Sequence, residues 1–155
     1  MAVEIERKFL VKPGWPKPRK GVPCVQGYLV SEKRCAVRVR TMGGRAFITV
    51  KSGAKGLARQ EFEYPIPASD ARALLRLCER PPVRKVRYIV RHGRVLWEVD
   101  VFSGENQGLV VAEIELSSER QQVDIPPWLG REVSGEPRYL NAALWRKPYA
   151  TWTKG

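Results

Sequence analysis

Charged side chains recur at every second position along many segments of this chain. The first of these segments is Val3-Glu4-Ile5-Glu6-Arg7-Lys8-Phe9, in which Glu4, Glu6 and Lys8 are spaced two apart. Successive side chains of a β-strand point to opposite faces, so these three lie on one face of an extended strand. The same spacing recurs later in Arg38-x-Arg40, Lys51, Arg59-x-Glu61-x-Glu63, Lys85-x-Arg87, Glu98-x-Asp100 and Glu113-x-Glu115.

Glycine and proline residues separate these alternating segments. Gly43-Gly44 and His92-Gly93 stand between pairs of them, and Pro81-Pro82 stops a segment with helical spacing. Strands are expected at residues 3–11, 25–31, 36–42, 45–51, 59–66, 83–90, 95–102 and 109–116. Short helices are expected at residues 70–79, with Ser69 as the N-cap, and at residues 138–145.

These elements predict a mainly β (α+β) fold. The expected architecture is an eight-stranded antiparallel closed β-barrel with a few short outer helices, formed by residues 1–155 as one domain. Closure has a functional consequence, because the interior of a barrel of about eight strands can hold one small ligand.

Composition argues against several classes of protein. No segment approaches the ~18 consecutive apolar residues that a membrane helix needs, and no secretory signal is expected. Cys24, Cys35 and Cys78 have neither the spacing of a zinc site nor that of a disulfide framework. Reduced thiols and a cytoplasmic location are therefore expected. The single histidine, His92, is expected in a solvated turn, so histidine-based catalysis or metal binding is not expected.

The net charge of +12 suggests a polyanionic partner, but the charge is unevenly distributed. The alternating sets hold seven basic and eight acidic residues, so a site built from them carries about −1. The remaining residues carry about +13. This outer charge can attract polyanions without defining a binding site for them.

The charged strand faces can point either to solvent or into the barrel. Strands with one polar and one apolar face are commonly amphipathic surface strands. Against that interpretation, the like-charged pairs Glu4/Glu6 and Arg38/Arg40 repel within a strand, whereas solvated surfaces usually mix signs. The charge also changes sign between strands, which would allow neutralisation across an interior. The pattern alone leaves both arrangements open.

A family resemblance favours the inward arrangement. Glu4-Ile5-Glu6-Arg7-Lys8 resembles the Glu-x-Glu-x-Lys signature of the CYTH superfamily, the triphosphate tunnel metalloenzymes. Further pieces follow in the order seen in short bacterial members of that family: Gln26-Gly27-Tyr28-Leu29, Arg38-x-Arg40, Lys51-Ser52-Gly53, Leu57-x-Arg59-x-Glu61-x-Glu63, Lys85-x-Arg87-Tyr88, Glu98-x-Asp100-Val101-Phe102, Val111-x-Glu113-x-Glu115 and Arg138-Tyr139-x-Asn141.

The resemblance implies a charged lumen that binds a triphosphate together with Mg²⁺, or alternatively Mn²⁺. The implied phosphate-binding residues are Lys8, Arg38, Arg40, Lys51, Arg59, Lys85 and Arg87. The implied metal ligands are Glu4, Glu6, Glu61, Glu63, Glu113 and Glu115. Glu98 and Asp100 either assist the metal or serve as structural partners for Arg38, Arg40 or Lys85.

Lys8, Lys51 and Tyr28 are the candidate catalytic residues. Crowding of Lys51 by other cations would let it lose its proton more readily, and Tyr28 could orient it or exchange a proton with it. Water activated by metal is the alternative means of producing the nucleophile.

The expected activity is Mg²⁺-dependent hydrolysis of the terminal phosphoanhydride of a triphosphate. Inorganic tripolyphosphate is the preferred substrate expected, with weaker action on nucleoside triphosphates. An adenylate cyclase of class IV type and a non-catalytic module that binds polyphosphate or nucleic acid are the alternatives. The expected partner is a small polyanion; nucleic acid is not required, and a homodimer would be compatible with the apolar outer wall.

Overall fold

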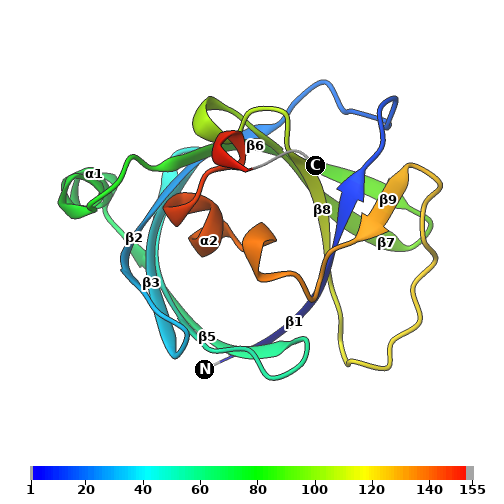
Figure 1. Cartoon of the computed structure of the whole chain (residues 1–155), viewed down its shortest axis with the longest axis horizontal. Coiled ribbons are helices and arrows are strands. Elements are labelled where there is room, and N and C mark those ends of the chain that lie inside the picture. The colour runs from blue at the N-terminus through cyan, green and yellow to red at the C-terminus, as the bar shows by residue number, and fades with distance from the viewer. Residues whose placement is uncertain (1, 153–155) are drawn as a thin grey trace.

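The computed structural model describes residues 2–152, and β-strands dominate that segment (Figure 1). Its strands are β1 (Ala2–Val11), β2 (Val22–Ser31), β3 (Cys35–Met42), β4 (Arg45–Ser52), β5 (Ala58–Ile66), β6 (Val83–His92), β7 (Val95–Phe102), β8 (Val110–Glu115) and β9 (Leu129–Glu132). Its α-helices are α1 (Ala68–Leu77) and α2 (Asn141–Arg146), and its 3₁₀ turns are η1 (Gly104–Asn106), η2 (Pro137–Tyr139) and η3 (Tyr149–Thr151). The strands agree closely with those predicted, apart from β9, which was not expected.

Eight antiparallel strands close into a barrel. Their order is β5-β4-β3-β2-β6-β7-β8-β1, and β1 pairs again with β5. That closing seam is short, running from Ala2 opposite Glu61 to Ile5 opposite Ala58. Farther along β1, β9 pairs with it, with Phe9 opposite Glu132. The predicted fold class is therefore confirmed.

Apolar side chains on the outer wall are covered on two sides. On one side α1 packs Ala71 against Val39 of β3 and Ala46 of β4. On the other, Trp97 and neighbouring apolar residues lie beneath partly buried Trp15 and Trp128, which belong to connecting segments. The charged strand faces consequently point inward, because the apolar faces of the same strands need these outer covers.

The two ends of the barrel differ. At the hairpin end, the turns at residues 43–44 and 93–94 join β3 to β4 and β6 to β7. At the helix end, residues 53–57 join β4 to β5, and α2 packs inside the ring of strands (Figure 1). Leu144 and Trp145 of α2 belong to one buried apolar cluster with Val83, Phe102 and Val111, each of which is two residues from a lumen charge. The barrel is therefore partly plugged at its helix end.

The helices differ in detail from the expectation. An outer position was expected for both, but α2 is internal because its apolar face fills the end of the lumen. Residues 138–139, expected in that helix, belong to η2. Pro67, not Ser69, is the N-cap of α1, and no side chain caps it. The helix ends at Leu77 because Cys78 has extended backbone angles.

His92 is the last residue of β6, half-buried, and its Nε2 lies 3.2 Å from Asp124 Oδ2. It is therefore a partnered strand-end residue next to the turn, not a fully solvated one.

No helix in residues 2–152 is both long and apolar enough to cross a membrane.

Candidate active site

The inward faces of the strands form a chamber of about 170 Å³. Of the described residues that line it, eleven are charged and the twelfth is an asparagine: Glu4, Glu6, Arg38, Arg40, Lys51, Glu61, Glu63, Arg87, Glu98, Glu113, Glu115 and Asn141. Eleven of the fifteen charged residues predicted for the site are therefore brought together in one chamber, and the other four lie outside its lining: Lys8, Arg59, Lys85 and Asp100. Carboxylates outnumber cations in this lining by seven to four, so the chamber favours added positive charge.

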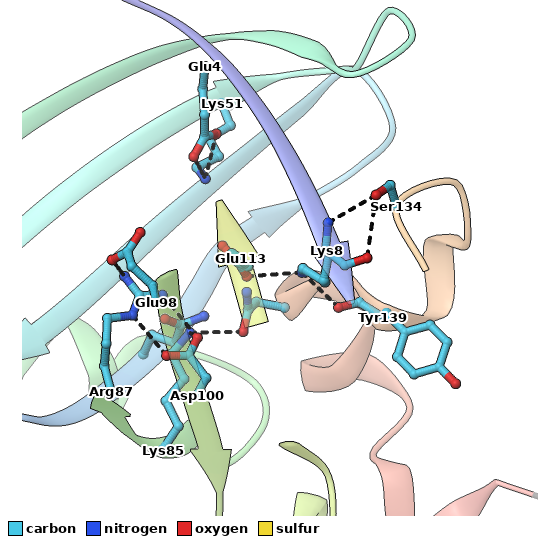
Figure 2. A network of polar contacts seen from close by, with 12 residues as sticks. Glu4, Lys8, Lys51, Lys85, Arg87, Glu98, Asp100, Glu113, Ser134 and Tyr139 are labelled. Carbon is cyan, nitrogen blue, oxygen red and sulfur yellow. Dashed lines mark hydrogen bonds and ion pairs between the residues drawn. The ribbon is translucent and has the colours of Figure 1, made fainter. Parts of the chain in front are cut away.

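A fully buried ion pair forms one side of the lumen (Figure 2). Lys85 Nζ lies 2.8 Å from Asp100 Oδ2, and neither side chain reaches solvent. Arg87 donates to both oxygens of Asp100, at 2.8 and 2.9 Å, and to Glu98 Oε2 at 2.7 Å. Burial opposes the charge on Asp100, but Lys85 and Arg87 outweigh it and lower the pKa of the carboxyl. Asp100 thus pairs with Lys85 and Arg87, and Glu98 pairs with Arg87, whereas Arg38 and Arg40 lie near Glu63.

Lys8 and two carboxyl groups form a second cluster. Lys8 Nζ lies 3.2 Å from Glu113 Oε1 and donates to the Tyr139 carbonyl oxygen at 3.0 Å. Burial opposes ionisation of Glu113, but Lys8, Arg87 and Lys85 outweigh it and hold its pKa well below the usual value. Burial, followed by repulsion from Glu113, raises the pKa of Glu6 to about 8. Without added cations, Glu6 therefore keeps its proton at neutral pH.

Lys51 lies between two carboxylates. Its Nζ is 3.0 Å from Glu4 Oε2 (Figure 2) and 3.4 Å from Glu61 Oε2. The β4–β5 and β1–β5 pairings thus place acids in direct contact with Lys51, where crowding by cations was expected. Tyr28 is buried against Trp145, and its hydroxyl accepts a hydrogen bond from Gln26 Nε2 at 3.2 Å.

Arg38 and Arg40 both approach Glu63 from β3. Their Nη2 atoms lie 3.7 and 3.8 Å from Glu63 Oε2, too far for strong hydrogen bonds. The Nε atoms of both arginines are buried and have no hydrogen-bond partner in the described part of the chain. Buried donors are rarely left unsatisfied in folded proteins, so both atoms are available to an acceptor in the lumen, either water or a ligand.

Three lumen residues were not assigned a role from the sequence. Thr49 is fully buried, and its hydroxyl donates to Glu63 Oε2 at 2.9 Å. Gln26 is also fully buried, and Asn141 Oδ1 accepts from Lys85 Nζ at 3.2 Å. Thr49 and Gln26 each stand two residues before an assigned site residue, Lys51 and Tyr28, so extending the alternation would have found them.

The lumen extends towards the helix end beyond this chamber. A constriction of about 50 Å³ includes Lys8, Arg38, Lys51, Arg59 and Tyr28 in its lining. A wider space of about 190 Å³ adjoins it, since Glu6, Lys8, Arg59 and Leu140 line both. Arg59 is therefore placed in the passage, whereas Arg40 and Arg87 belong to the chamber.

Divalent metal fits the donor set but would require movement of side chains. Residues 2–152 contain no group of three acids close enough to hold an ion as they stand. The seven chamber carboxylates nevertheless supply hard oxygen ligands of the kind that Mg²⁺ and Mn²⁺ prefer. The raised pKa of Glu6 marks the place where a proton compensates crowded acids, and a cation could replace that proton.

Comparisons with known proteins agree with this geometry. Residues 2–144 match the CYTH domain. An inorganic triphosphatase of Acetivibrio thermocellus is 46% identical over 151 residues, covering 96% of this chain and 97% of the relative. Another, of Nitrosomonas europaea, is 40% identical over 148 residues, covering 91% and 95%. The crystal structure of an inorganic triphosphatase aligns with a TM-score of 0.68 at 36% identity, covering 100% of this chain and 99% of the other.

Proposed function

The chain belongs to the CYTH domain family, and we propose that it hydrolyses the terminal phosphoanhydride of inorganic tripolyphosphate in an Mg²⁺-dependent reaction. Nucleoside triphosphates are poorer substrates in this proposal. Its support comes from the lumen and from the relatives named inorganic triphosphatase, which span nearly the whole chain.

The observation that carries the proposal is the pair of unpartnered Nε donors of Arg38 and Arg40. Each is buried at the wall of a chamber in which almost every lining group is charged. A phosphate oxygen is an acceptor that a guanidinium can bind at two points. A substrate with several phosphates would satisfy both arginines and bring them into one contact network.

Hydrolysis requires charge neutralisation and an in-line approach of water to the terminal phosphorus. Arg38, Arg40 and Arg87 line the chamber and would hold the non-bridging oxygens of the terminal phosphate. Lys8, Lys51 and Arg59 line the constriction and would hold the remaining phosphates. The fixed positions of these cations would orient the phosphate chain of the substrate. They would also favour departure of the leaving group as negative charge builds on that group.

The carboxylates would serve the same reaction as metal ligands. Glu4, Glu6, Glu113 and Glu115 would hold one Mg²⁺, and Glu61 and Glu63 would help to place a second ion or its water. Bound Mg²⁺ would supply charge neutralisation and a more acidic water. Glu6 contributes by giving up the proton that its burial and the neighbouring charge of Glu113 retain, and Glu113 is already ionised.

A phosphate-release assay tests the proposal. Tripolyphosphate, ATP, thiamine triphosphate and pyrophosphate would each be incubated with and without Mg²⁺, and the products separated by chromatography. We expect orthophosphate and pyrophosphate from tripolyphosphate, and ADP with orthophosphate from ATP. Cyclic AMP and pyrophosphate as main products of ATP would instead identify a cyclase. Binding that is sensitive to salt but yields no product would indicate a polyanion-binding module.

A further inference from the structure

The strand register gives two lumen arginines different neighbours from the other lumen cations. Three of those cations lie directly opposite an acid on an adjacent strand and pair with it at 2.8 to 3.4 Å: Lys8 with Glu113, Lys51 with Glu61 and Arg87 with Asp100. Arg38 of β3 instead lies between Tyr28 and Thr49. Both residues opposite Arg40 are uncharged as well. Neither arginine therefore has an acid directly opposite it.

Thr49 separates Arg38 from the acid Glu63. Arg38 of β3 lies opposite Thr49 of β4, which in turn lies opposite Glu63 of β5, so the threonine is the middle of a row across three strands. Its hydroxyl donates to Glu63 Oε2 at 2.9 Å and accepts from Arg38 Nη2 at 3.4 Å. The hydroxyl thus provides Glu63 with a neutral donor at a shorter distance than either arginine does.

The two arginines are consequently only partly neutralised. Their Nη2 atoms lie 3.7 and 3.8 Å from Glu63 Oε2, beyond the usual length of a charge-assisted hydrogen bond. Burial, followed by repulsion from Arg38, lowers the pKa of Arg40. An added anion stabilises a buried cation in this state more than one that already holds a carboxylate, because less of its charge is compensated.

We propose that Thr49 is a positioning residue whose hydroxyl keeps Glu63 from pairing fully with Arg38 and Arg40, and so leaves both guanidinium groups available to phosphate. This inference rests on the proposed triphosphatase function. Thr49 is fully buried and does not line the chamber, so it acts through Glu63 and not by touching substrate. Without the hydroxyl, Glu63 would lose its short hydrogen bond and move onto the arginines. A phosphate would then have to break those charge-assisted bonds before it could bind.

Binding of an uncleavable substrate analogue tests this role without depending on turnover. The probe is bis-methylene triphosphate, in which carbon replaces both bridging oxygens, and its Kd would be measured with Mg²⁺ by calorimetry. Thr49→Val keeps the shape of the side chain but removes the hydroxyl, so we expect Kd to rise about 10-fold or more. Thr49→Ala, which also lacks the hydroxyl, should change Kd in the same direction. Thr49→Ser keeps the hydroxyl and should stay within about 3-fold of wild type.

A matched control and a double-mutant cycle show how Thr49 acts. Thr41→Val makes the same change at a half-buried threonine on the outward face of β3, and it should leave Kd unchanged. Glu63→Gln removes the charge that Thr49 restrains, so Thr49→Val should change Kd by less than about 2-fold in that background. Equal losses with and without Glu63→Gln would overturn the proposal. So would an unchanged Kd in Thr49→Val, or a loss in Thr49→Ser as large as that in Thr49→Val.

Steady-state kinetics on tripolyphosphate separates failure of this inference from failure of the proposed function. Competition by Glu63 weakens ground-state and transition-state binding alike, so Thr49→Val should raise KM while kcat changes by less than about 3-fold. If tripolyphosphate is hydrolysed but Thr49→Val changes neither Kd nor KM, only the Thr49 assignment fails. If no triphosphate is hydrolysed but Thr49→Val weakens binding of the analogue and Thr49→Ser does not, the assignment stands and the hydrolytic function fails.

Discussion

Lys85 Nζ and Asp100 Oδ2 lie 2.8 Å apart, and both side chains are completely buried in the barrel wall. Burial lowers the pKa of Lys85, whereas the charge of Asp100 favours its protonated form. Removing one partner of such a pair leaves an uncompensated charge and typically costs about 3–5 kcal/mol. Asp100 also accepts hydrogen bonds from Arg87, so the pair couples the stability of the barrel to the position of that arginine.

Asp100→Asn should consequently destabilise the protein by about 3 kcal/mol at pH 7, measured by urea unfolding. The loss should diminish at alkaline pH. Lys85 in the variant has a folded-state pKa below its unfolded value, so stability rises as pH rises from the former to the latter. Lys85→Met combined with Asp100→Asn should recover part of the loss. A double variant less stable than Asp100→Asn alone would contradict this account.

Glu6→Gln should make the metal-free protein less sensitive to alkaline pH. The pKa of Glu6 is raised to about 8 in the folded protein, above its value in the unfolded chain. The stability contributed by the protonated side chain is therefore complete below the pKa of the unfolded state and is lost as pH rises towards 8. Glutamine removes that loss. We expect a melting temperature several degrees above wild type at pH 8.5 and a smaller difference at pH 5, both in chelator. Glu105→Gln, an exposed change, is the control; an equal response would argue against the Glu6 assignment.

Lys51 should act as a cation that positions substrate and carboxylates, given its contacts with Glu4 and Glu61. Lys51→Arg keeps the charge, so it should retain more than about a tenth of wild-type kcat/KM, whereas Lys51→Met should retain less than about a hundredth. The two variants would be compared between pH 7 and 10. A steep alkaline rise in wild type that is absent in Lys51→Arg would restore the base hypothesis, because arginine cannot lose its proton in this range.

Leu144→Ala should destabilise the protein by about 2–5 kcal/mol, because Leu144 is fully buried in the apolar plug that α2 forms. Leu77→Ala is the matched control. Leu77 is a helical leucine of α1 that is 72% exposed, and its loss should change stability by less than about 0.5 kcal/mol. Chemical unfolding of both variants measures the difference, and similar values would show that α2 does not anchor the barrel end.

The sequence predicted most of the barrel because alternation is a local property of each strand. Val37 and Arg38, for example, must point to opposite faces once β3 is extended. Alternation alone could not predict which residues line the lumen, because the charged face of an amphipathic strand can point either way. The family resemblance resolved that choice. Thr49 was missed because it is uncharged, although it shares the spacing of Lys51.

Other features depend on contacts between distant segments and could not be predicted locally. The partner of Lys51 follows from the register of β4 with β5 and of β1 with β5. The apolar face of α2 indicates burial but not on which side of the barrel wall. β9 is four residues long and lacks alternating apolar positions, so its pairing with β1 had no sequence signal.

We propose that the charged lumen hydrolyses tripolyphosphate with the help of carboxylate-bound Mg²⁺. The decisive measurement is phosphate release from tripolyphosphate, titrated with Mg²⁺ for wild type, Glu6→Gln and Glu105→Gln. We predict Mg²⁺-dependent turnover in wild type and Glu105→Gln, and a loss of about 100-fold or more in Glu6→Gln with the fold intact by circular dichroism. Near-normal, Mg²⁺-dependent turnover in folded Glu6→Gln, or wild-type turnover indifferent to Mg²⁺, would contradict it.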